Sequence, residues 1–442
     1  MNTLLAISPI DGRYYNKTNN LSEYFSEFAY FKYRLYIEIT YFLKLVHTLD
    51  LNNKELVFKN ESVILDLVNK FSINDAENIK NIEKTTNHDV KAVEYYFKDF
   101  LDKKGLSEFT EFVHFGLTSQ DINTCSLMLS IKKYLHNDFK CLYTNLTYVL
   151  IKKIQNWNTV VIMSRTHGQP ASPTTMGKEY KVFLYRLNNQ YNNNIKIYTT
   201  FGGAVGNFNA HYLAYPDIDW EKFANEYINK MGMLRSKYTT QIENYDSLAN
   251  ILDNLKRINT ILIDLCQDTW LYISYNYFNL KINKNEVGSS TMPHKINPID
   301  FENAEGNLYL ANCIIELMSR KLPISRLQRD LSDSTITRNI GTIFGYITIA
   351  FKSIITGLNK LEVNTKVINQ DLENNWVIVS EGIQHLLRKK GLEGYEILKE
   401  LTRNNKALNK TNLINELKEY LDQEELEQIA NLVPENYVGN LT

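Results

Sequence analysis

The sequence predicts an all-α protein built around a bundle of long helices. Its 442 residues include only 18 glycines and 8 prolines, and neither occurs between Gly116 and Gly168 or between Gly232 and Gly288. Such uninterrupted stretches favour long helices, and the scarcity of alternating apolar and polar residues predicts few strands. Within the second stretch, apolar residues recur at heptad spacing, which predicts a helix packed lengthwise against its neighbours: Leu248, Ile251, Leu255, Ile258, Leu262 and Leu265.

The chain is longer than one compact core usually covers, so we expect three helical domains. The N-terminal domain covers residues 1–105 and ends at Lys103-Lys104-Gly105, which has the pattern of a helix C-cap. The long-helix bundle covers residues 106–360. Shorter helices form the C-terminal domain, residues 361–442, which is interrupted at Gly391 and Gly394.

The composition argues against several classes of protein. Lys and Arg (49) nearly balance Asp and Glu (50), and the net charge of -1 gives no overall attraction to nucleic acid or to an anionic membrane. The N-terminus lacks the basic region of a signal peptide, and the most apolar later run, residues 340–351, is too short to span a bilayer. We therefore expect a cytoplasmic protein that binds neither nucleic acid nor membrane.

The cysteines and histidines predict no metal site. No CxxC spacing is present, so the cysteines are expected to be reduced thiols of the core. The histidines that lie near polar segments are scattered rather than paired at zinc spacing. The four cysteines are Cys125, Cys141, Cys266 and Cys313, and the histidines near polar segments, four of the eight in the chain, are His88, His167, His211 and His294.

Three polar segments between predicted helices are rich in small or cationic residues, and chemistry often resides on such loops. They are residues 118–121, 164–170 and 288–298. In the last, Gly288 permits unusual backbone angles, two serines supply hydroxyls and Lys295 supplies a charge. Asn297-Pro298 is typical of the start of a helix. This segment is either a loop that brings a hydroxyl and an ammonium to an anionic substrate or a plain connection with a helix cap.

His167 lies in the segment 164–170, two residues after Arg165. An imidazole titrates near neutral pH, which suits proton transfer at a site that binds anions. The alternative is a histidine that only hydrogen-bonds within its loop.

Two further segments have the pattern of helix N-termini. Thr86 and Asp89 are spaced as a capping box, and so are Thr118 and Asp121. Capping explains these residues, but it does not call for His88, and free N–H groups at a helix start can also bind an anion. The glycine-rich run 202–207 superficially resembles a nucleotide-binding loop, but no strand is expected before it.

The run 322–338 gathers arginines and hydroxyl side chains in a loop and a helix start. Its arginines are Arg326, Arg329 and Arg338. Guanidinium groups suit carboxylates and phosphates, so this run is either an anion-binding segment or solvated surface charge.

Taken together, these motifs resemble the fumarase/aspartase superfamily of helical lyases. Residues 288–298 match the superfamily signature GSSxMPxKxNP, and their Met-Pro-His-Lys form is similar to that of the adenylosuccinate lyase family. Four more segments resemble the bacterial type of that family: residues 8–14, 85–95, 164–171 and 329–335. One departure is Gln120, where glutamate is more usual before the aspartate.

The resemblance implies an all-α, three-domain helical lyase whose central bundle assembles into a homotetramer, with active sites shared between subunits. It implies two β-eliminations in purine biosynthesis, without a metal or cofactor. One splits adenylosuccinate into AMP and fumarate, and the other splits the ribotide SAICAR into AICAR and fumarate. An argininosuccinate lyase and a relative without activity are the alternatives, although an intact His167, Ser289 and Lys295 argue against the second.

The resemblance also implies roles for single residues. His167 is the expected general acid and Ser289 the expected general base, with Ser290 or His88 as alternatives for the base, and Glu302 orients His167. Lys295 and Asn297 are expected to bind the succinyl carboxylates. The remaining substrate-binding residues are expected around the phosphate and the rest of the pocket: Arg13, Tyr14, Asn87, His88, Asp89, Thr118, Ser119, Gln241, Arg329, Ser334, Thr335, Ile336, Thr337 and Arg338.

Overall fold

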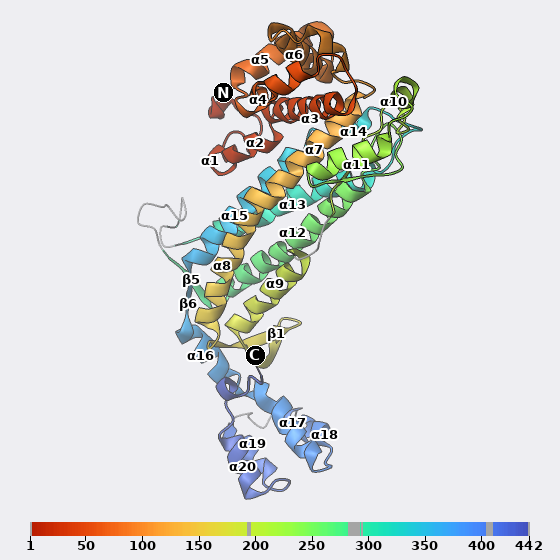
Figure 1. The fold of residues 1–442 in the computed structure, drawn as a ribbon. Coiled ribbons are helices and arrows are strands. Elements are labelled where there is room, and N and C mark those ends of the chain that lie inside the picture. The colour runs from red at the N-terminus through yellow and green to blue at the C-terminus, as the bar shows by residue number, and fades with distance from the viewer. Residues whose placement is uncertain (1, 192–195, 282–291, 293–294, 404–409, 441–442) are drawn as a thin grey trace. The chain divides into compact units, whose positions relative to one another are not determined.

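The computed structural model describes residues 2–191, 196–281, 292, 295–403 and 410–440. In this part of the chain, helices dominate and the strands form three two-stranded sheets, which confirms the predicted all-α class (Figure 1). The chain divides into two compact units. Unit 1 comprises Met1–Tyr143, Asn192–Thr260 and Gly306–Lys352, and unit 2 comprises Thr144–Tyr191, Ile261–Glu305 and Ser353–Thr442. The division into three domains stays a prediction.

The first part of unit 1 is a cluster of helices around its own apolar core, which includes Phe42 and Phe97. The last of these helices ends as predicted, because Gly105 adopts a left-handed conformation (φ +72°) and the N–H of Leu106 donates to the carbonyl of Leu101 at 2.9 Å. The helices of this core are α3 (Glu27–Thr48), α4 (Glu55–Asn69), α5 (Ile73–Thr86) and α6 (Asp89–Lys103), and the short helices α1 (Tyr15–Thr18) and α2 (Ser22–Phe25) precede them in the chain.

The glycine- and proline-free stretches form long helices. The first contains α7 (Ser119–Tyr134), a π-helical turn (Leu135–Phe139) and α8 (Lys140–Trp157), while the second contains α12 (Asp246–Ser274). Every heptad position of α12 from Leu248 to Leu265 is at most 2 % exposed, so the predicted lengthwise packing is confirmed. Further long helices are α13 (Ile299–Lys321) and α15 (Ile340–Lys360), the latter preceded by α14 (Ser332–Thr337).

Short elements complete unit 1. The two-residue strand β3 (Tyr198–Thr199) pairs in parallel with β4 (Leu234–Arg235), and α10 (Asn209–Ala214) and α11 (Trp220–Lys230) lie between them in sequence. β3 directly precedes the glycine-rich run 202–207, so the expectation that no strand stands there was wrong. A pair of two residues carries no periodicity that a sequence pattern can reveal.

Unit 2 corrects the prediction that residues 164–170 form a loop between helices. They belong to an antiparallel hairpin of β1 (Val161–Thr166) and β2 (Gln169–Thr175). Near the start of β1 and at the end of β2, apolar or β-branched side chains such as Ile162 and Thr175 are buried. The polar residues 164–170 therefore occupy the exposed end of a ribbon whose other end is held in the core.

The rest of unit 2 contains α9 (Met176–Tyr191), a second antiparallel pair, β5 (Phe278–Leu280) with β6 (Leu361–Val363), and the predicted short helices near the C-terminus. Leu387, Leu417 and Ile429 are fully buried in a separate apolar cluster that these helices share. The helices that share the cluster are α17 (Ser380–Lys389), α18 (Gly394–Arg403), α19 (Lys410–Leu417) and α20 (Gln423–Ala430), and α16 (Thr365–Asn374) precedes them in the chain.

The cysteines and the most apolar run of the chain depart in part from what the sequence predicted. All four cysteines are free, but Cys141 and Cys313 are exposed, so the core location is confirmed only for Cys125 and Cys266. The expectation that the most apolar run is too short to span a bilayer was wrong, because the helical run Ser332–Lys360 is long and apolar enough by length and composition, and its most apolar window is 67% buried within the protein. A core helix of a soluble protein has the same properties.

Candidate active site

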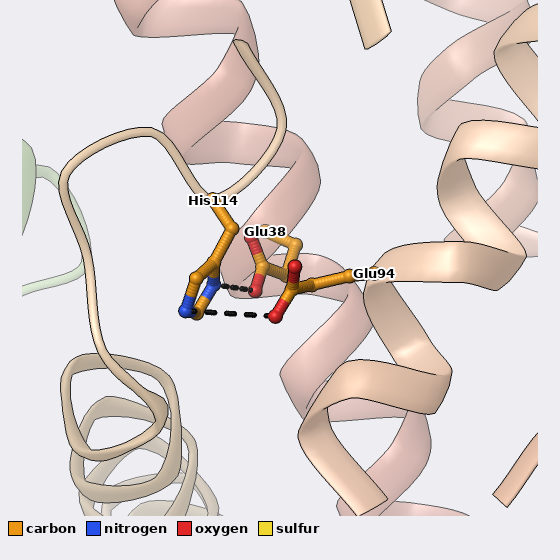
Figure 2. A group of neighbouring side chains, drawn as sticks. All are labelled: Glu38, Glu94 and His114. Atoms are coloured by element: carbon orange, nitrogen blue, oxygen red, sulfur yellow. Dashed lines mark hydrogen bonds and ion pairs between the residues drawn. The ribbon is translucent and has the colours of Figure 1, made fainter. Parts of the chain in front are cut away.

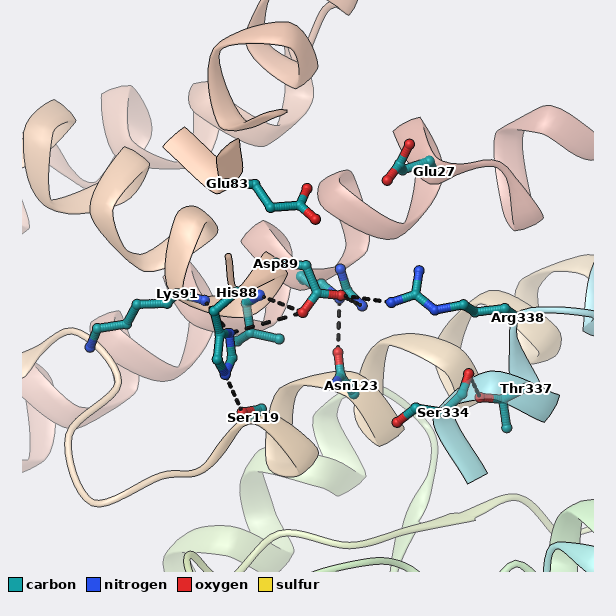
Figure 3. A network of polar contacts seen from close by, with 12 residues as sticks. Glu27, Glu83, His88, Asp89, Lys91, Ser119, Asn123, Ser334, Thr337 and Arg338 are labelled. Atoms are coloured by element: carbon teal, nitrogen blue, oxygen red, sulfur yellow. Dashed lines mark hydrogen bonds and ion pairs between the residues drawn. The ribbon is translucent and has the colours of Figure 1, made fainter. Parts of the chain in front are cut away.

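Unit 1 contains a cavity of about 310 Å³ that brings together many of the predicted substrate-binding residues. The starts of α6 and α7, the helix α3 and the segment 329–338 all contribute side chains to its lining (Figure 3). The predicted residues in the lining are Asn87, His88, Asp89, Ser119, Arg329, Ser334, Thr337 and Arg338. The lining residues that the sequence did not indicate include Tyr30, Arg34, Asn123, Tyr245 and Asp333.

His88, rather than Thr86, caps α6. Helix α5 continues through Thr86, Asn87 turns into a left-handed conformation (φ 51°), and Nδ1 of His88 accepts the N–H of Lys91 at 3.2 Å. The predicted capping box was therefore wrong, because α6 has its N-cap at His88, two residues later than the pattern suggested. A neutral imidazole that accepts at Nδ1 carries its proton on Nε2, which lies 3.4 Å from Oγ of Ser119. His88 thus directs an N–H group toward the cavity.

Asp89 links two arginines at the cavity. Its Oδ2 lies 2.9 Å from Nη2 of Arg34 and 3.3 Å from Nη2 of Arg338. Burial by itself raises the pKa of the Asp89 carboxyl, but Arg34, the N–H of Val90 and Arg338 outweigh it and hold that pKa below its usual value. Asp89 therefore orients cations rather than contributing a proton.

Arg34 is the most informative residue that the sequence-based prediction missed. It lies on α3 near the fully buried Leu35, its side chain is 11% exposed, and its Nε donates to Oδ1 of Asn123 at 2.9 Å. A lone arginine among apolar helix positions is the signal that could have indicated it, because buried charge requires a partner.

A buried network around Asp333 joins three distant segments. Oδ2 of Asp333 accepts hydrogen bonds from Nε2 of Gln120 at 2.9 Å and from the hydroxyl of Tyr245 at 3.0 Å. The N–H of Ser334 donates to Oδ1 at 2.8 Å. Burial, and then the charge of Asp333, raises the pKa of Tyr245 far above its usual value, so its hydroxyl stays protonated and donates. The network positions Ser334 at the cavity.

The glycine-rich run 202–207 contacts a carboxylate of the protein itself. The N–H groups of Gly202 and Gly203 donate to Oδ1 of Asp121 at 2.8 and 3.3 Å. Oδ2 of Asp121 accepts the N–H of Thr118 at 2.9 Å, which confirms the capping box predicted for α7. These N–H groups therefore hold the start of α7 in place instead of presenting a phosphate site.

Gln241 is hydrogen-bonded to Arg329, which lines the cavity. Its Oε1 accepts a hydrogen bond from Nη1 of Arg329 at 3.0 Å, and its Nε2 donates to the carbonyl of Ala204 at 3.1 Å. Two residues that were both predicted to bind substrate, Gln241 and Arg329, are thus in direct contact.

Some predicted binding residues of unit 1 lie outside the cavity lining. Thr118 caps α7, while Thr335 and Ile336 lie on α14 beside lining residues. Arg13 is exposed, and its guanidinium lies 5.9 Å from the ring centre of Tyr14. Arg338 lines the main cavity and also a second cavity of about 200 Å³, whose walls include Ser8, Asp11 and Tyr15.

The predicted acid belongs to unit 2. His167 is exposed at the turn of the β1–β2 hairpin, where it and Gly168 have φ values of 53° and 73°. Neighbouring Arg165 pairs with Asp371 at 3.3 Å and lies over the ring of Tyr275 at 4.7 Å. The hairpin also borders a cavity of about 650 Å³ within this unit. The turn presents the imidazole to solvent on a rigid ribbon.

The signature segment is described only in part. Ser289, Ser290 and His294 lie outside the described residues, so the roles of both serines stay predictions. Lys295 is exposed and Asn297 half-buried just before α13, which begins at Ile299 as predicted. Glu302, in the first turn of α13, accepts a hydrogen bond from the indole N–H of Trp270 at 3.1 Å. Its predicted contact with His167 stays a prediction.

Comparisons with known proteins agree with these motifs. A family model described as lyase matches residues 12–311, and one described as adenylosuccinate lyase C-terminal matches residues 325–438. The chain is 51% identical to an adenylosuccinate lyase of Dictyostelium discoideum, over 91% of this chain and 89% of that protein. It is 42% identical to an adenylosuccinate lyase of Escherichia coli strain K12, over 99% of this chain and 97% of that protein.

Solved structures show the same fold at low sequence identity. A β-carboxy-cis,cis-muconate cycloisomerase from Acinetobacter calcoaceticus superposes with a TM-score of 0.71 at 17% identity, covering 97% of both chains. A 3-carboxy-cis,cis-muconate lactonizing enzyme from Pseudomonas putida also gives 0.71, at 18% identity, covering 96% of this chain and 94% of that one. The likeness to these two enzymes concerns the fold alone, whereas the family models and the curated relatives agree on one function. The chain is therefore a lyase that belongs to the adenylosuccinate lyase family.

Proposed function

We propose that this lyase splits adenylosuccinate into AMP and fumarate, and SAICAR into AICAR and fumarate. The observation that carries this proposal is the cavity of unit 1, whose lining combines three arginines with several hydroxyl groups and three carboxylates; the arginines are Arg34, Arg329 and Arg338. Both substrates carry one phosphate and two carboxylates, and guanidinium groups suit such anions. The identity of the substrate is inferred from the name that the curated relatives carry, adenylosuccinate lyase.

The elimination requires a base, an acid and a place for negative charge. The base removes a proton from the succinyl carbon next to a carboxylate, the C–N bond breaks, and the acid protonates the departing nitrogen. We assign the base to Ser289 and the acid to His167, with Glu302 orienting the acid. Lys295 and Asn297 stabilise the carboxylate on which charge develops, because fixed cations and N–H donors are most effective where charge increases.

Arg338 is the proposed phosphate ligand with the clearest support. Asp89 contacts one of its terminal nitrogens at 3.3 Å, yet the side chain remains 61% exposed. The guanidinium is therefore oriented and still accessible to an anion. Ser334 and Thr337 line the same cavity and add hydroxyl donors, while Arg13 and Tyr14 are assigned to the phosphate from the neighbouring N-terminal segment.

We further propose a cytoplasmic homotetramer in which each active site combines segments from three subunits. His167 and the signature segment belong to unit 2, whereas the cavity with the three arginines belongs to unit 1. Helix α13 also exposes large apolar side chains, since Tyr309, Leu310 and Leu317 are 50%, 50% and 48% exposed. Apolar faces of this kind favour association with other copies of the chain.

The test is an assay of the purified protein with each substrate, following fumarate release. Fumarate from adenylosuccinate and from SAICAR, with none from argininosuccinate, is the expected result. Turnover of argininosuccinate alone would assign the protein to the alternative lyase, and no turnover of any of the three would point to a relative without activity. Full activity of a monomer, at concentrations where no tetramer forms, would contradict the shared active site.

A further inference from the structure

A buried cluster of ionisable residues joins three elements of unit 1. Glu38 lies on α3, Glu94 on α6, and His114 in the segment that leads to α7. Nδ1 of His114 lies 2.6 Å from Oε1 of Glu38, and Nε2 lies 3.6 Å from Oε1 of Glu94 (Figure 2). The side chains of Glu38, Glu94 and His114 are 0%, 5% and 12% exposed. The imidazole is thus held between two carboxylates.

The surrounding charges favour an imidazolium ion. Burial lowers the pKa of His114, but Glu38, Glu94 and Asp121 outweigh burial and raise that pKa above its usual value. Nζ of Lys91 lies 2.6 Å from Oε2 of Glu94. Burial raises the pKa of Glu38, and the charges of His114 and Lys91 oppose that rise. The two carboxyl groups therefore face two basic side chains of the chain, although their ligand types would also suit a metal ion.

The burial of the Glu38 carboxyl group is energetically unfavourable. It is fully buried, and within the described part of the chain its Oε2 has no hydrogen-bond partner. A buried carboxylate with an unsatisfied oxygen loses solvation that one ion pair does not fully restore. An apolar side chain of similar size would cost less, so stability alone does not account for this carboxylate. Among the described residues, the carboxyl group of Glu38 makes its close polar contact with His114, and this contact indicates its role.

The segment that contains His114 has an unusual backbone. His114 has φ 58° and Gly116 has φ 68°, both in the left-handed region. A side chain at Gly116 would place its Cβ 2.4 Å from the ring of His211, and the carbonyl of Phe115 accepts the hydroxyl of Tyr41 at 2.6 Å. A non-glycine residue keeps a left-handed conformation only where its surroundings hold it, and such positions cluster at functional sites.

The same segment leads directly to Ser119, which lines the cavity. Thr118 caps α7 through Asp121, and Ser119 follows directly and faces His88 at 3.4 Å. Helix α6 carries both His88, at its start, and Glu94, less than two turns further on. A shift of His114 relative to α3 and α6 would therefore move Ser119 relative to His88.

We propose that Glu38 is a positioning residue that acts through His114. Its carboxylate, together with Glu94, clamps His114 and so holds Thr118 and Ser119 in the geometry that binds substrate. The link to substrate rests on the proposed function, whereas the clamp itself is testable without turnover.

The first experiment measures the clamp directly. Hydrogen–deuterium exchange of the amides of residues 115–119 is compared among the wild type, Glu38→Gln and the control Glu61→Gln. Glu61 pairs with His47 at 3.2 Å in an exposed glutamate–histidine pair, so the control makes the same change on the surface. We expect exchange to rise at least about 10-fold in Glu38→Gln, because these amides open locally, and to stay unchanged in the control.

The second experiment measures the effect on substrate. In Glu38→Gln, the KM for adenylosuccinate should rise at least about 10-fold with a smaller change in kcat, because misplaced binding groups weaken ground-state and transition-state binding alike. The alkaline limb of kcat/KM should move to lower pH, since a neutral glutamine no longer favours the proton on His114. Glu38→Asp retains the charge and should restore the position of this limb.

Several outcomes would overturn the proposal. Unchanged exchange at residues 115–119 would remove the clamp, and a lower melting temperature with unchanged KM and pH profile would reduce Glu38 to a structural role. If Glu38→Gln does not fold, Glu94→Gln tests the other side of the clamp, and an absence of any change there also contradicts it. Wild-type protein without activity on adenylosuccinate would defeat the proposed function but leave the exchange result decisive for the clamp.

Discussion

The side-chain amide of Gln120 donates a hydrogen bond to the carboxylate of Asp333 across 2.9 Å, and these two residues are 213 positions apart in sequence. Both are buried and both line the candidate cavity. Asp333 also accepts from Tyr245, so it receives two hydrogen bonds at one oxygen. Gln120 is the position at which the chain departs from the family motif, and its amide supplies a donor that a glutamate would have to provide in protonated form.

Replacing Gln120 with glutamate should therefore make stability depend on pH. Two buried carboxyl groups in contact cannot both ionise, so one of them acquires a raised pKa in the folded state. The stability that this carboxyl group contributes in its protonated form is present at acidic pH and is lost as pH rises through the raised pKa. We expect Gln120→Glu to cost about 1–3 kcal/mol in the free energy of unfolding at pH 8 and less at pH 5. Urea unfolding at both pH values measures this, with the exposed Gln428→Glu as control. An equal cost at both values would contradict the argument.

The acid and base assignments predict large losses of rate without loss of fold. His167→Ala and Ser289→Ala should each lower kcat by at least about 100-fold, in line with the usual contribution of acid–base groups. Steady-state kinetics with adenylosuccinate, together with circular dichroism, measures both effects. His385→Ala changes an exposed histidine of α17 and should leave kcat unchanged. A near-normal rate in Ser289→Ala would transfer the base to Ser290 or His88.

The proposed phosphate contact predicts a binding defect in Arg338 variants. Arg338→Ala should raise KM by about 10- to 100-fold, which corresponds to one lost charged hydrogen bond, and should change kcat less. Arg338→Lys should recover only part of this, because lysine keeps the charge but loses the planar pair of donors. Arg388→Ala removes an exposed arginine of α17 and serves as the control. The phosphate role would be wrong if KM stayed normal in Arg338→Ala.

The ion pairs of Asp89 predict that the protein loses stability as pH falls into the acidic range. Its pKa is lowered in the folded state, so the stability it contributes is present above its unfolded pKa of about 3.9 and is lost as pH falls through the lower folded value. Asp89→Asn leaves Arg34 without its carboxylate and should cost about 1–3 kcal/mol at neutral pH. Thermal unfolding between pH 7 and pH 3 should show the two proteins converging at the acidic end. The exposed pair Asp66–Lys70 gives a matched control, Asp66→Asn, for which a much smaller change is expected.

The amino-acid sequence was sufficient where structure depends on neighbours along the chain. The heptad positions of α12, the C-cap at Gly105 and the capping box of Thr118 and Asp121 each involve residues a few positions apart. Side chains at such spacing meet in any helix, so periodicity and capping patterns were enough to predict them. The motif matches also identified fewer than half of the residues that line the cavity, and local chemistry alone left each motif open between a function and a cap or surface charge.

The tertiary structure decided what depends on contacts between distant segments. The sequence did not show that α5 would extend through Thr86 and leave His88 as the cap of α6, or that residues 164–170 would form the end of a hairpin. It also gave no sign that Arg34 would pair with Asp89, or that Gln120 would meet Asp333. These contacts form because burial forces each polar group to find a partner, and the packing of the whole chain determines which partner is within reach.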